Sequence, residues 1–477
     1  MKAKIIIYVF TLACTFAVSS STLFGQTVTK PRLIVLTDIC YMEPDDAQSL
    51  VRLLVYSNQF DIKGLIASTS EGNKSELFSG YIRKLIGEYA KIRSNLLKHE
   101  SGFPKETELL ASVKDGLPVY GMAGVGNGKD SEGSEWIIKK LKDKDNRPLW
   151  INLWGGSNVL AQALWKIKET RSEQEAKQLI AKLRVYAISD QDDSGAWIRK
   201  NFPDLFYIVS PGRYQDGTWA GIMSVIPGIN NDVVSNFWIA ENVQQGHGPL
   251  GAVYPNVVYG VEGDTPSFLY LINNGLNSPE HPNWGSWGGR YELSIPPYDP
   301  TIRWRIPIAQ ETRPIWTNTD DTYTPTKETQ WGRSIDNDTI RIKSNKATVV
   351  RWREDFQNDF AARMDWCVKD YKNANHPPIV KLLTPQHITV KSGEIFNLDG
   401  TSCSDPDGDG LIYYWFYYKE AGDYSDVFRL FPPNSARVTA KAPVVDSEKT
   451  IHFILKVTDR GTPRLTRYAR VLVTVKP

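Results

Sequence analysis

Between residues 31 and 285, short apolar runs alternate with segments whose apolar residues have helical spacing, and this alternation restricts the fold strongly. The apolar runs begin at Arg32, Ile62, Leu149 and Leu183. They are continuous along the chain, which is typical of strands buried on both faces of a parallel sheet. We therefore predict an α/β domain with a mostly parallel sheet and with ligands at the carboxyl ends of its strands.

The last part of the chain has a different pattern. Residues 374–378, Ala-Asn-His-Pro-Pro, are a linker signal, and short segments with strand-like alternation follow them. We predict an Ig-like β-sandwich domain for residues 376–477. The α/β domain then covers residues 26–375, and residues 286–375 are an irregular, Trp-rich extension of it. A length of 477 residues agrees with two or three domains.

The N-terminus predicts export. Lys2 and Lys4 precede an apolar run, and small and polar residues follow it, as in a secretory signal peptide. We predict a signal peptide over residues 1–25 and a secreted or periplasmic protein. A lipoprotein site at Cys14 is the less favoured alternative. No later segment reaches the ~18 uncharged apolar residues of a membrane span.

Composition excludes some kinds of partner and of metal site. Lys+Arg is 56 and Asp+Glu is 54, a formal charge of +2, so no basic field favours nucleic acid. The chain has no CxxC and no HExxH motif, so metal chemistry would use oxygen ligands. Of its 15 Trp, fourteen precede the linker. Trp284 and Trp287 stand among glycines and are predicted to stack on a sugar; a packed loop is the alternative.

Four carboxylates crowd the loop after the first predicted strand: Asp38, Glu43, Asp45 and Asp46. Like charges this close repel unless a positive group lies among them. Capping of the following helix accounts for one Asp. Hard oxygen ligands at a strand end suit Ca²⁺ or Mg²⁺. The alternative is a capped helix with exposed acids.

This loop, with three later segments, resembles nucleoside hydrolases. Residues 62–73, residues 153–164 and residues 263–266 are similar, in the same order, to the family's second strand, its Gly-Pro-Leu-Thr-Asn segment and its late Asp motif. The resemblance implies a Ca²⁺ site and a general base. It assigns Asp38, Asp46, Asp264 and the Ser157 carbonyl to the metal, Asp38 also to the base, and Asp45 and Asn73 to sugar hydroxyls.

The segments also depart from the family pattern on the leaving-group side. Gly263 stands where the family often has a His as leaving-group acid, and Glu43 is extra. Asp192 or Asp193 could orient the substrate or be the missing acid; the alternative is a solvated loop that caps a helix. Glu43 is another candidate acid and substrate ligand. The pattern resembles most the secreted, nucleoside-hydrolase-like proteins known as a cellulose-binding family with a C-terminal Ig-like domain.

These features predict a secreted, calcium-dependent hydrolase of glycosidic bonds that acts on a sugar or a polysaccharide-derived glycoside. The alternative is a non-catalytic carbohydrate-binding protein that keeps the fold. A homo-oligomer is possible on either reading. One further acidic segment, Asp405, Asp407 and Asp409, resembles the Asp-rich turn of PKD-type sandwich domains. It lacks the downstream Glu of an EF-hand, and we interpret it as a turn rather than a Ca²⁺ site.

Overall fold

The computed structural model describes residues 29–330, 334–337 and 339–477. Residues from Pro31 to Pro477 form one compact unit, and the boundary at residue 376 stays a prediction. The predicted signal peptide and Cys14 lie outside the described residues. Within the described ranges, no helix is long and apolar enough to cross a membrane.

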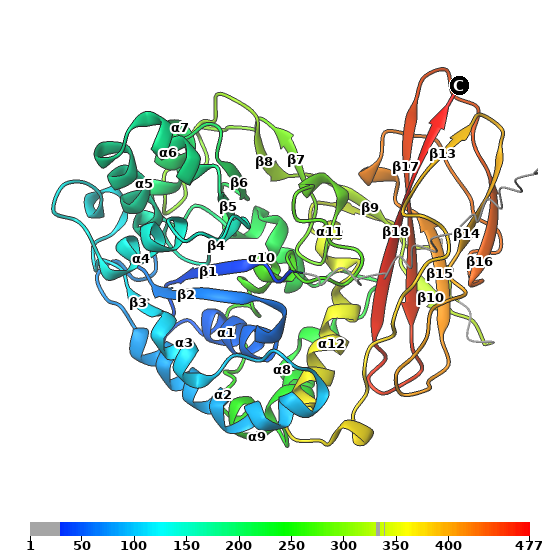
Figure 1. The fold of residues 1–477 in the computed structure, drawn as a ribbon, viewed down its shortest axis with the longest axis horizontal. Coiled ribbons are helices and arrows are strands. Elements are labelled where there is room, and N and C mark those ends of the chain that lie inside the picture. The colour runs from blue at the N-terminus through cyan, green and yellow to red at the C-terminus, as the bar shows by residue number, and fades with distance from the viewer. Residues whose placement is uncertain (1–28, 331–333, 338) are drawn as a thin grey trace, which may run out of the picture. The chain divides into compact units, whose positions relative to one another are not determined.

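An eight-stranded sheet in the described chain has the order β3-β2-β1-β4-β5-β6-β8-β7 (Figure 1). All neighbouring strands are parallel except β7 and β8. Thr37 pairs with Ala67 and Leu36 with Leu153, so the carboxyl ends of the central strands meet at one edge. The strands are β1 (Arg32–Thr37), β2 (Asp61–Ala67), β3 (Val113–Asp115), β4 (Leu149–Leu153), β5 (Leu183–Ala187), β6 (Phe206–Val209), β7 (Tyr291–Ser294) and β8 (Ile315–Asn318).

Helices cover both faces of this sheet, which explains why its strands are apolar throughout. In β1, Leu33 and Val35 join one hydrophobic cluster, whereas Ile34 and Leu36 join another on the opposite face. The first cluster receives α1 (Asp45–Val55), α2 (Ser79–His99), α10 (Thr265–Leu269) and α12 (Arg353–Asp365). The second receives α4 (Glu132–Leu141), α5 (Asn158–Thr170), α6 (Glu173–Ile180) and α7 (Ser194–Asn201). The predicted α/β class is confirmed.

Shorter elements fill the connections. The remaining helices are α3 (Glu106–Ser112), α8 (Asn236–Ile239), α9 (Gly248–Ala252) and α11 (Ala347–Val350). The predicted irregular extension contributes β7 and β8 to the main sheet. It also holds two small ladders, made of β9 (Asp321–Tyr323), β10 (Thr326–Glu328), β11 (Ser334–Asp336) and β12 (Ile342–Ser344).

The C-terminal region is all-β, as predicted. One sheet has the order β13-β18-β17-β15 and the other pairs β14 with β16. The strands are β13 (His387–Lys391), β14 (Ile395–Asp399), β15 (Ile412–Tyr417), β16 (Arg437–Lys441), β17 (Lys449–Thr458) and β18 (Thr466–Lys476). Residues 379–383, just after the linker, take part in this region through the isolated bridge from Ile379 to Ser404.

A buried polar network joins α12 to the sandwich. Asp355 accepts hydrogen bonds from the Tyr468 hydroxyl, from Lys456 Nζ at 2.7 Å and from Thr466 Oγ1 at 3.2 Å. Nearby, Arg467 Nη1 lies 2.6 Å from Asp359 Oδ2. Because a buried carboxylate is costly without partners, these contacts favour one arrangement of the sandwich on the α/β sheet.

Candidate functional site

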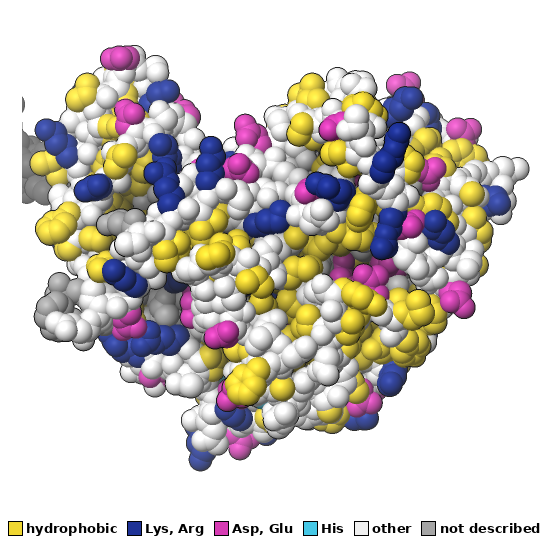
Figure 2. Space-filling view, turned by 180° about the vertical axis from the view of Figure 1, so that it is seen from behind, with side chains coloured by type: hydrophobic (Ala, Val, Ile, Leu, Met, Phe, Trp, Pro, Cys, Tyr) yellow, Lys and Arg dark blue, Asp and Glu magenta, His cyan; other side chains and the backbone are white. Residues whose placement is uncertain are grey.

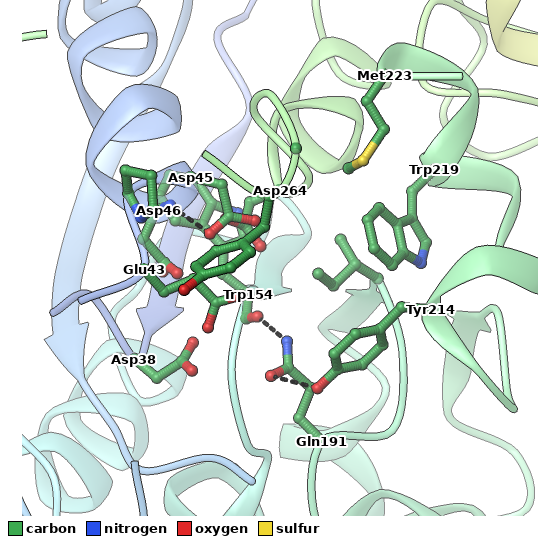
Figure 3. Close-up of a pocket in the computed structure, with 14 residues that line it drawn as sticks. Asp38, Glu43, Asp45, Asp46, Trp154, Gln191, Tyr214, Trp219, Met223 and Asp264 are labelled. Atoms are coloured by element: carbon green, nitrogen blue, oxygen red, sulfur yellow. Dashed lines mark hydrogen bonds between the residues drawn. The ribbon is translucent and has the colours of Figure 1, made fainter. Parts of the chain in front are cut away.

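A pocket of about 150 Å³ opens at the carboxyl edge of the sheet. Figure 2 shows acidic side chains at the bottom of a hollow that hydrophobic side chains surround. In Figure 3 the carboxylates lie on one side of the pocket, and Gln191, Tyr214 and Trp219 on the other. The lining residues are Asp38, Glu43, Pro44, Asp45, Asp46, Trp154, Ile188, Gln191, Tyr214, Trp219, Met223, Tyr259, Gly260 and Asp264.

Asp38 follows the last residue of β1 and is buried in the wall of the pocket. Its Oδ2 accepts a hydrogen bond from Ser70 Oγ, whereas its Oδ1 has no hydrogen-bond partner among the described residues. Gly155 makes room for it, since a Cβ at that position would lie 2.6 Å from Asp38 Oδ1. Burial raises the pKa of Asp38 to about 7. The hydrogen bond from Ser70 opposes this rise, and the charge of Glu43 adds to it.

Asp45, Asp46 and Asp264 form a tight carboxylate cluster in the same pocket. Each offers an oxygen within 4.8 Å of the others. Asp45 and Asp46 begin α1, and Asp264 immediately precedes α10. Thr37 Oγ1 donates to Asp46, while the buried Asp264 Oδ2 is without a hydrogen-bond partner in the part of the chain that the structure describes.

The electrostatics of this cluster call for a positive charge. Burial first, and then the neighbouring acids, raise the pKa of Asp46 and Asp264 well above the ordinary value. Burial and the charges of Glu43 and Asp38 raise the pKa of Asp45 to about 7. Oxygen-only donors of this kind fit a hard cation such as Ca²⁺, and the unpartnered Asp264 oxygen fits it too.

The predicted metal ligands therefore come together in part. Asp46 and Asp264 meet as expected, but Asp45 joins their cluster, and Asp38 lies beside it in the same pocket. Ser157 is not among the pocket-lining residues of the described chain. Its carbonyl accepts the Ala161 amide at 2.9 Å as α5 begins, and because a carbonyl oxygen has two lone pairs, its role as a metal ligand stays a prediction.

The predicted catalytic Asp192 and Asp193 are outside the set of residues that line the pocket in the described chain. Asp192 Oδ1 accepts from Ser157 Oγ at 3.1 Å and from the Ser194 amide at 2.9 Å. Its Oδ2 accepts from the Asn158 amide at 3.2 Å. Asp193 is exposed and accepts from the Met122 amide at 2.8 Å. The alternative of a solvated loop that caps a helix fits in part: Asp192 accepts amides where α5 and α7 begin but is buried, and the Asp193 side chain makes no cap bond to α7.

The remaining predicted sugar ligands also lie elsewhere, apart from Glu43 and Asp45. Asn73 closes its own loop, with Nδ2 donating to the Glu76 carbonyl at 2.9 Å. Trp287 is fully buried and its Nε1 donates to the Tyr468 hydroxyl of the sandwich at 3.3 Å. Trp284 stacks on His281 with ring centroids 3.9 Å apart. For Trp287 the prediction of sugar stacking is corrected, because the ring is packed against the sandwich. Trp284 is half-buried and meets His452 of the sandwich edge-on, outside the pocket.

The wall opposite the acids was not predicted from the sequence. Gln191 Nε2 donates to the Trp154 carbonyl, and the Tyr214 hydroxyl donates to Gln191 Oε1 at 3.3 Å. Trp219 is 5% exposed and Tyr259 is 79% exposed. Gln191 could have been proposed from the sequence, because it is a polar residue soon after a predicted strand. The aromatic residues of this wall come from irregular segments that give no such signal.

Comparison with family models decides the relationship. Residues 32–291 match the model described as cellulose-binding Sde182, nucleoside hydrolase-like domain. The chain belongs to this family. Residues 395–475 match the model of the C-terminal domain of cellulose-binding protein Sde0182. No match was found among curated proteins.

Solved structures agree with this assignment. A nucleoside hydrolase-related hypothetical protein from Saccharophagus degradans, described as associated with carbohydrate metabolism, is 34% identical. The match covers 94% of this chain and 100% of that chain, with a TM-score of 0.76. A second match, 21% identical to the PKD domain of the KIAA 1837 protein, has a TM-score of 0.16.

Proposed function

We propose that this protein is a calcium-dependent hydrolase that cleaves the glycosidic bond of a sugar or of a polysaccharide-derived glycoside. The observation that carries the proposal is the pair of buried carboxylate oxygens, Asp38 Oδ1 and Asp264 Oδ2, that have no protein partner in the described ranges and belong to two residues lining one pocket. The family description, cellulose-binding and nucleoside hydrolase-like, supports a carbohydrate ligand.

Asp45, Asp46 and Asp264 would hold the cation. Bound there, Ca²⁺ would supply a site for sugar hydroxyls and for a water of lowered pKa. Neutralising the cluster would also let all three carboxylates ionise together, which burial and mutual repulsion otherwise oppose.

Asp38 is the residue best placed as general base. The Ser70 hydroxyl fixes Oδ2, so Oδ1 remains to accept a proton from a water in the pocket. The surrounding carboxylates would stabilise the positive charge that develops on the sugar in an oxocarbenium-like transition state.

The opposite wall would orient the substrate. Trp219 and Tyr259 offer ring faces to a sugar, and Gln191 offers an amide that Tyr214 holds in place. Glu43 lies on the acidic side of the pocket and is the candidate ligand for an outer hydroxyl.

The test is a hydrolysis screen with Ca²⁺ on nucleosides and polysaccharide fragments, followed by Asp38→Asn. We expect the variant to lose at least about 100-fold in kcat, within the range of general-base catalysis, and to keep sugar binding. Asp193→Asn is the matched control because Asp193 is an exposed acid outside the pocket, and it should keep its activity. Equal activity of both variants would contradict the assigned base.

A second candidate function is carbohydrate binding without turnover. It is favoured by the position of Asp192, whose two oxygens are both occupied by protein donors away from the pocket, so this candidate leaving-group acid is absent from it and Glu43 is the candidate that remains. A wild type that binds oligosaccharides with Ca²⁺ but hydrolyses no member of the panel would select this function.

A further inference from the structure

A second cluster of carboxylates lies in the sandwich, far along the chain from the pocket. Asp405, Asp407 and Asp409 each offer an oxygen within 4.8 Å of the others. The segment reads Asp-Pro-Asp-Gly-Asp-Gly, which matches the first half of an EF-hand loop, where positions 1, 3 and 5 bind Ca²⁺ and a Gly follows. Position 12 would fall on Phe416, so this segment lacks the bidentate Glu that usually occupies that position.

Two buried oxygens at this place are without partners in the described chain. Asp405 Oδ1 accepts the amides of Asp407 and Asp409 at 2.9 and 3.0 Å, but Asp405 Oδ2 is buried without any donor. The side chain of Asn375 is 6% exposed, and its buried Oδ1 likewise has no donor. A buried acceptor without a partner costs free energy, and a cation that both oxygens bind would remove that cost.

The linker and one hairpin converge on this cluster. The amide of His376, the residue after Asn375, donates to Asp407 Oδ2 at 2.7 Å. Asn375 Nδ2 donates to the fully buried Asp459 Oδ2 at 3.1 Å. Burial raises the pKa of Asp459 to about 6, and the charge of Asp405 adds a smaller increase. Asn375 therefore lies beside the cluster, because its neighbour His376 contacts Asp407 and its own side chain contacts Asp459, which senses the charge of Asp405.

The histidine next to Asn375 also contacts the cluster. His376 Nδ1 lies 3.0 Å from Asp407 Oδ1, and His376 Nε2 lies 2.9 Å from His99 Nδ1. Three carboxylates in one turn repel one another unless a positive charge lies among them.

We infer that Asp405, Asp407 and Asp409, with the Asn375 side-chain oxygen, form a second Ca²⁺ site that ties the linker to the sandwich. This proposal differs from the interpretation of the segment as a plain turn. The site is independent of the proposed hydrolase function, since it uses none of the pocket residues. Oxygen-only donors on a flexible turn favour Ca²⁺ over Mg²⁺, which demands near-ideal octahedral geometry.

The experiment counts the Ca²⁺ ions bound to the full chain, after treatment with a chelator, by isothermal titration calorimetry. We expect two equivalents for the wild type, one for Asp264→Asn, one for Asp405→Asn and none for the double variant. Asp446→Asn is the matched control, because Asp446 is an exposed acid of the same sandwich, and it should bind two. Circular dichroism of each variant verifies folding, and Asp409→Asn replaces Asp405→Asn if the latter does not fold.

The outcomes separate this inference from the proposed function. If Asp264→Asn binds no Ca²⁺ while the wild type binds one equivalent, the sandwich site is overturned and the pocket site stands. If the wild type binds one equivalent that Asp405→Asn loses and Asp264→Asn keeps, the sandwich site stands and the calcium dependence of the hydrolase fails. If the wild type binds none, both are overturned.

Discussion

Asp46 and Asp264 point carboxylate oxygens at each other within 4.8 Å, although one residue begins α1 and the other precedes α10. Both are buried, and Asp264 Oδ2 has no donor in the described residues. Helices α1 and α10 pack on the same face of the sheet, so their first residues converge on one point. The fold thus concentrates negative charge where a cation can neutralise it.

Asp264→Asn should weaken the response of stability to Ca²⁺. In the wild type, Ca²⁺ should raise the Tm, because a ligand that binds the folded state stabilises it. The variant loses one buried charge, so without Ca²⁺ its Tm should exceed that of the wild type, and its pocket affinity for Ca²⁺ should fall by at least about 100-fold. Differential scanning calorimetry with EDTA or Ca²⁺ measures both effects. An unchanged Ca²⁺ response of the pocket, with Asp299→Asn as exposed control, would contradict the assignment.

The stability of the calcium-free protein should fall as pH rises from about 4 to 7. Asp38 and Asp45 have pKa values raised to about 7 from 3.8, so the folded state binds more protons than the unfolded state within that window. The free energy of unfolding then decreases with pH, by about 1.4 kcal/mol for each unit of pKa difference. Thermal melts in EDTA should show this trend, and melts in Ca²⁺ should flatten it. An EDTA form that is equally stable relative to the calcium form at pH 5 and pH 8 would refute the prediction.

Tyr214→Phe should weaken substrate binding without unfolding the protein. The Tyr214 hydroxyl donates to Gln191 Oε1, and its loss frees the amide that lines the pocket. One hydrogen bond is worth about 1 kcal/mol, so we expect KM to rise about fivefold. Tyr298→Phe, at an exposed tyrosine, is the control. A KM for Tyr214→Phe equal to that of the control would exclude a role for this pair.

Trp287→Ala and Trp219→Ala should separate structural from binding tryptophans. Trp287 is fully buried against Phe356 and Tyr468, so its removal should cost about 3–5 kcal/mol of stability. Sugar affinity of the folded fraction should not change. Trp219 lines the pocket, and its removal should lower sugar affinity. Urea melts and a binding titration distinguish them; lost affinity in Trp287→Ala at full folding would restore the sugar-stacking prediction.

Much of the pocket could be predicted because its ligands are close in sequence. Asp38, Glu43, Asp45 and Asp46 occupy one loop between a strand and a helix, and the parallel sheet places that loop at the carboxyl edge. Asp264 could be added only through the family resemblance. Its side chain reaches the loop because α10 packs beside α1, a contact that no local pattern specifies.

The roles of Ser157, Asp192 and the tryptophans could not be read from the sequence. A carbonyl or carboxylate at a strand end can serve a ligand or a helix N-terminus, and the choice depends on which donors the packing brings near. Here the amides of Asn158, Ala161 and Ser194 take those oxygens. Likewise a Trp among glycines can face solvent or another domain, and the sandwich covers Trp287.

By itself, the sequence determined the α/β class, the all-β C-terminal region and the acidic loop, because hydrophobic periodicity and charge crowding are local properties of the chain. Only the tertiary structure decided which oxygens remain without donors and which aromatic rings face the pocket. Those outcomes depend on side chains from distant segments, such as Gln191, Tyr214 and Asp264, that meet only when the helices and the sandwich close on the sheet.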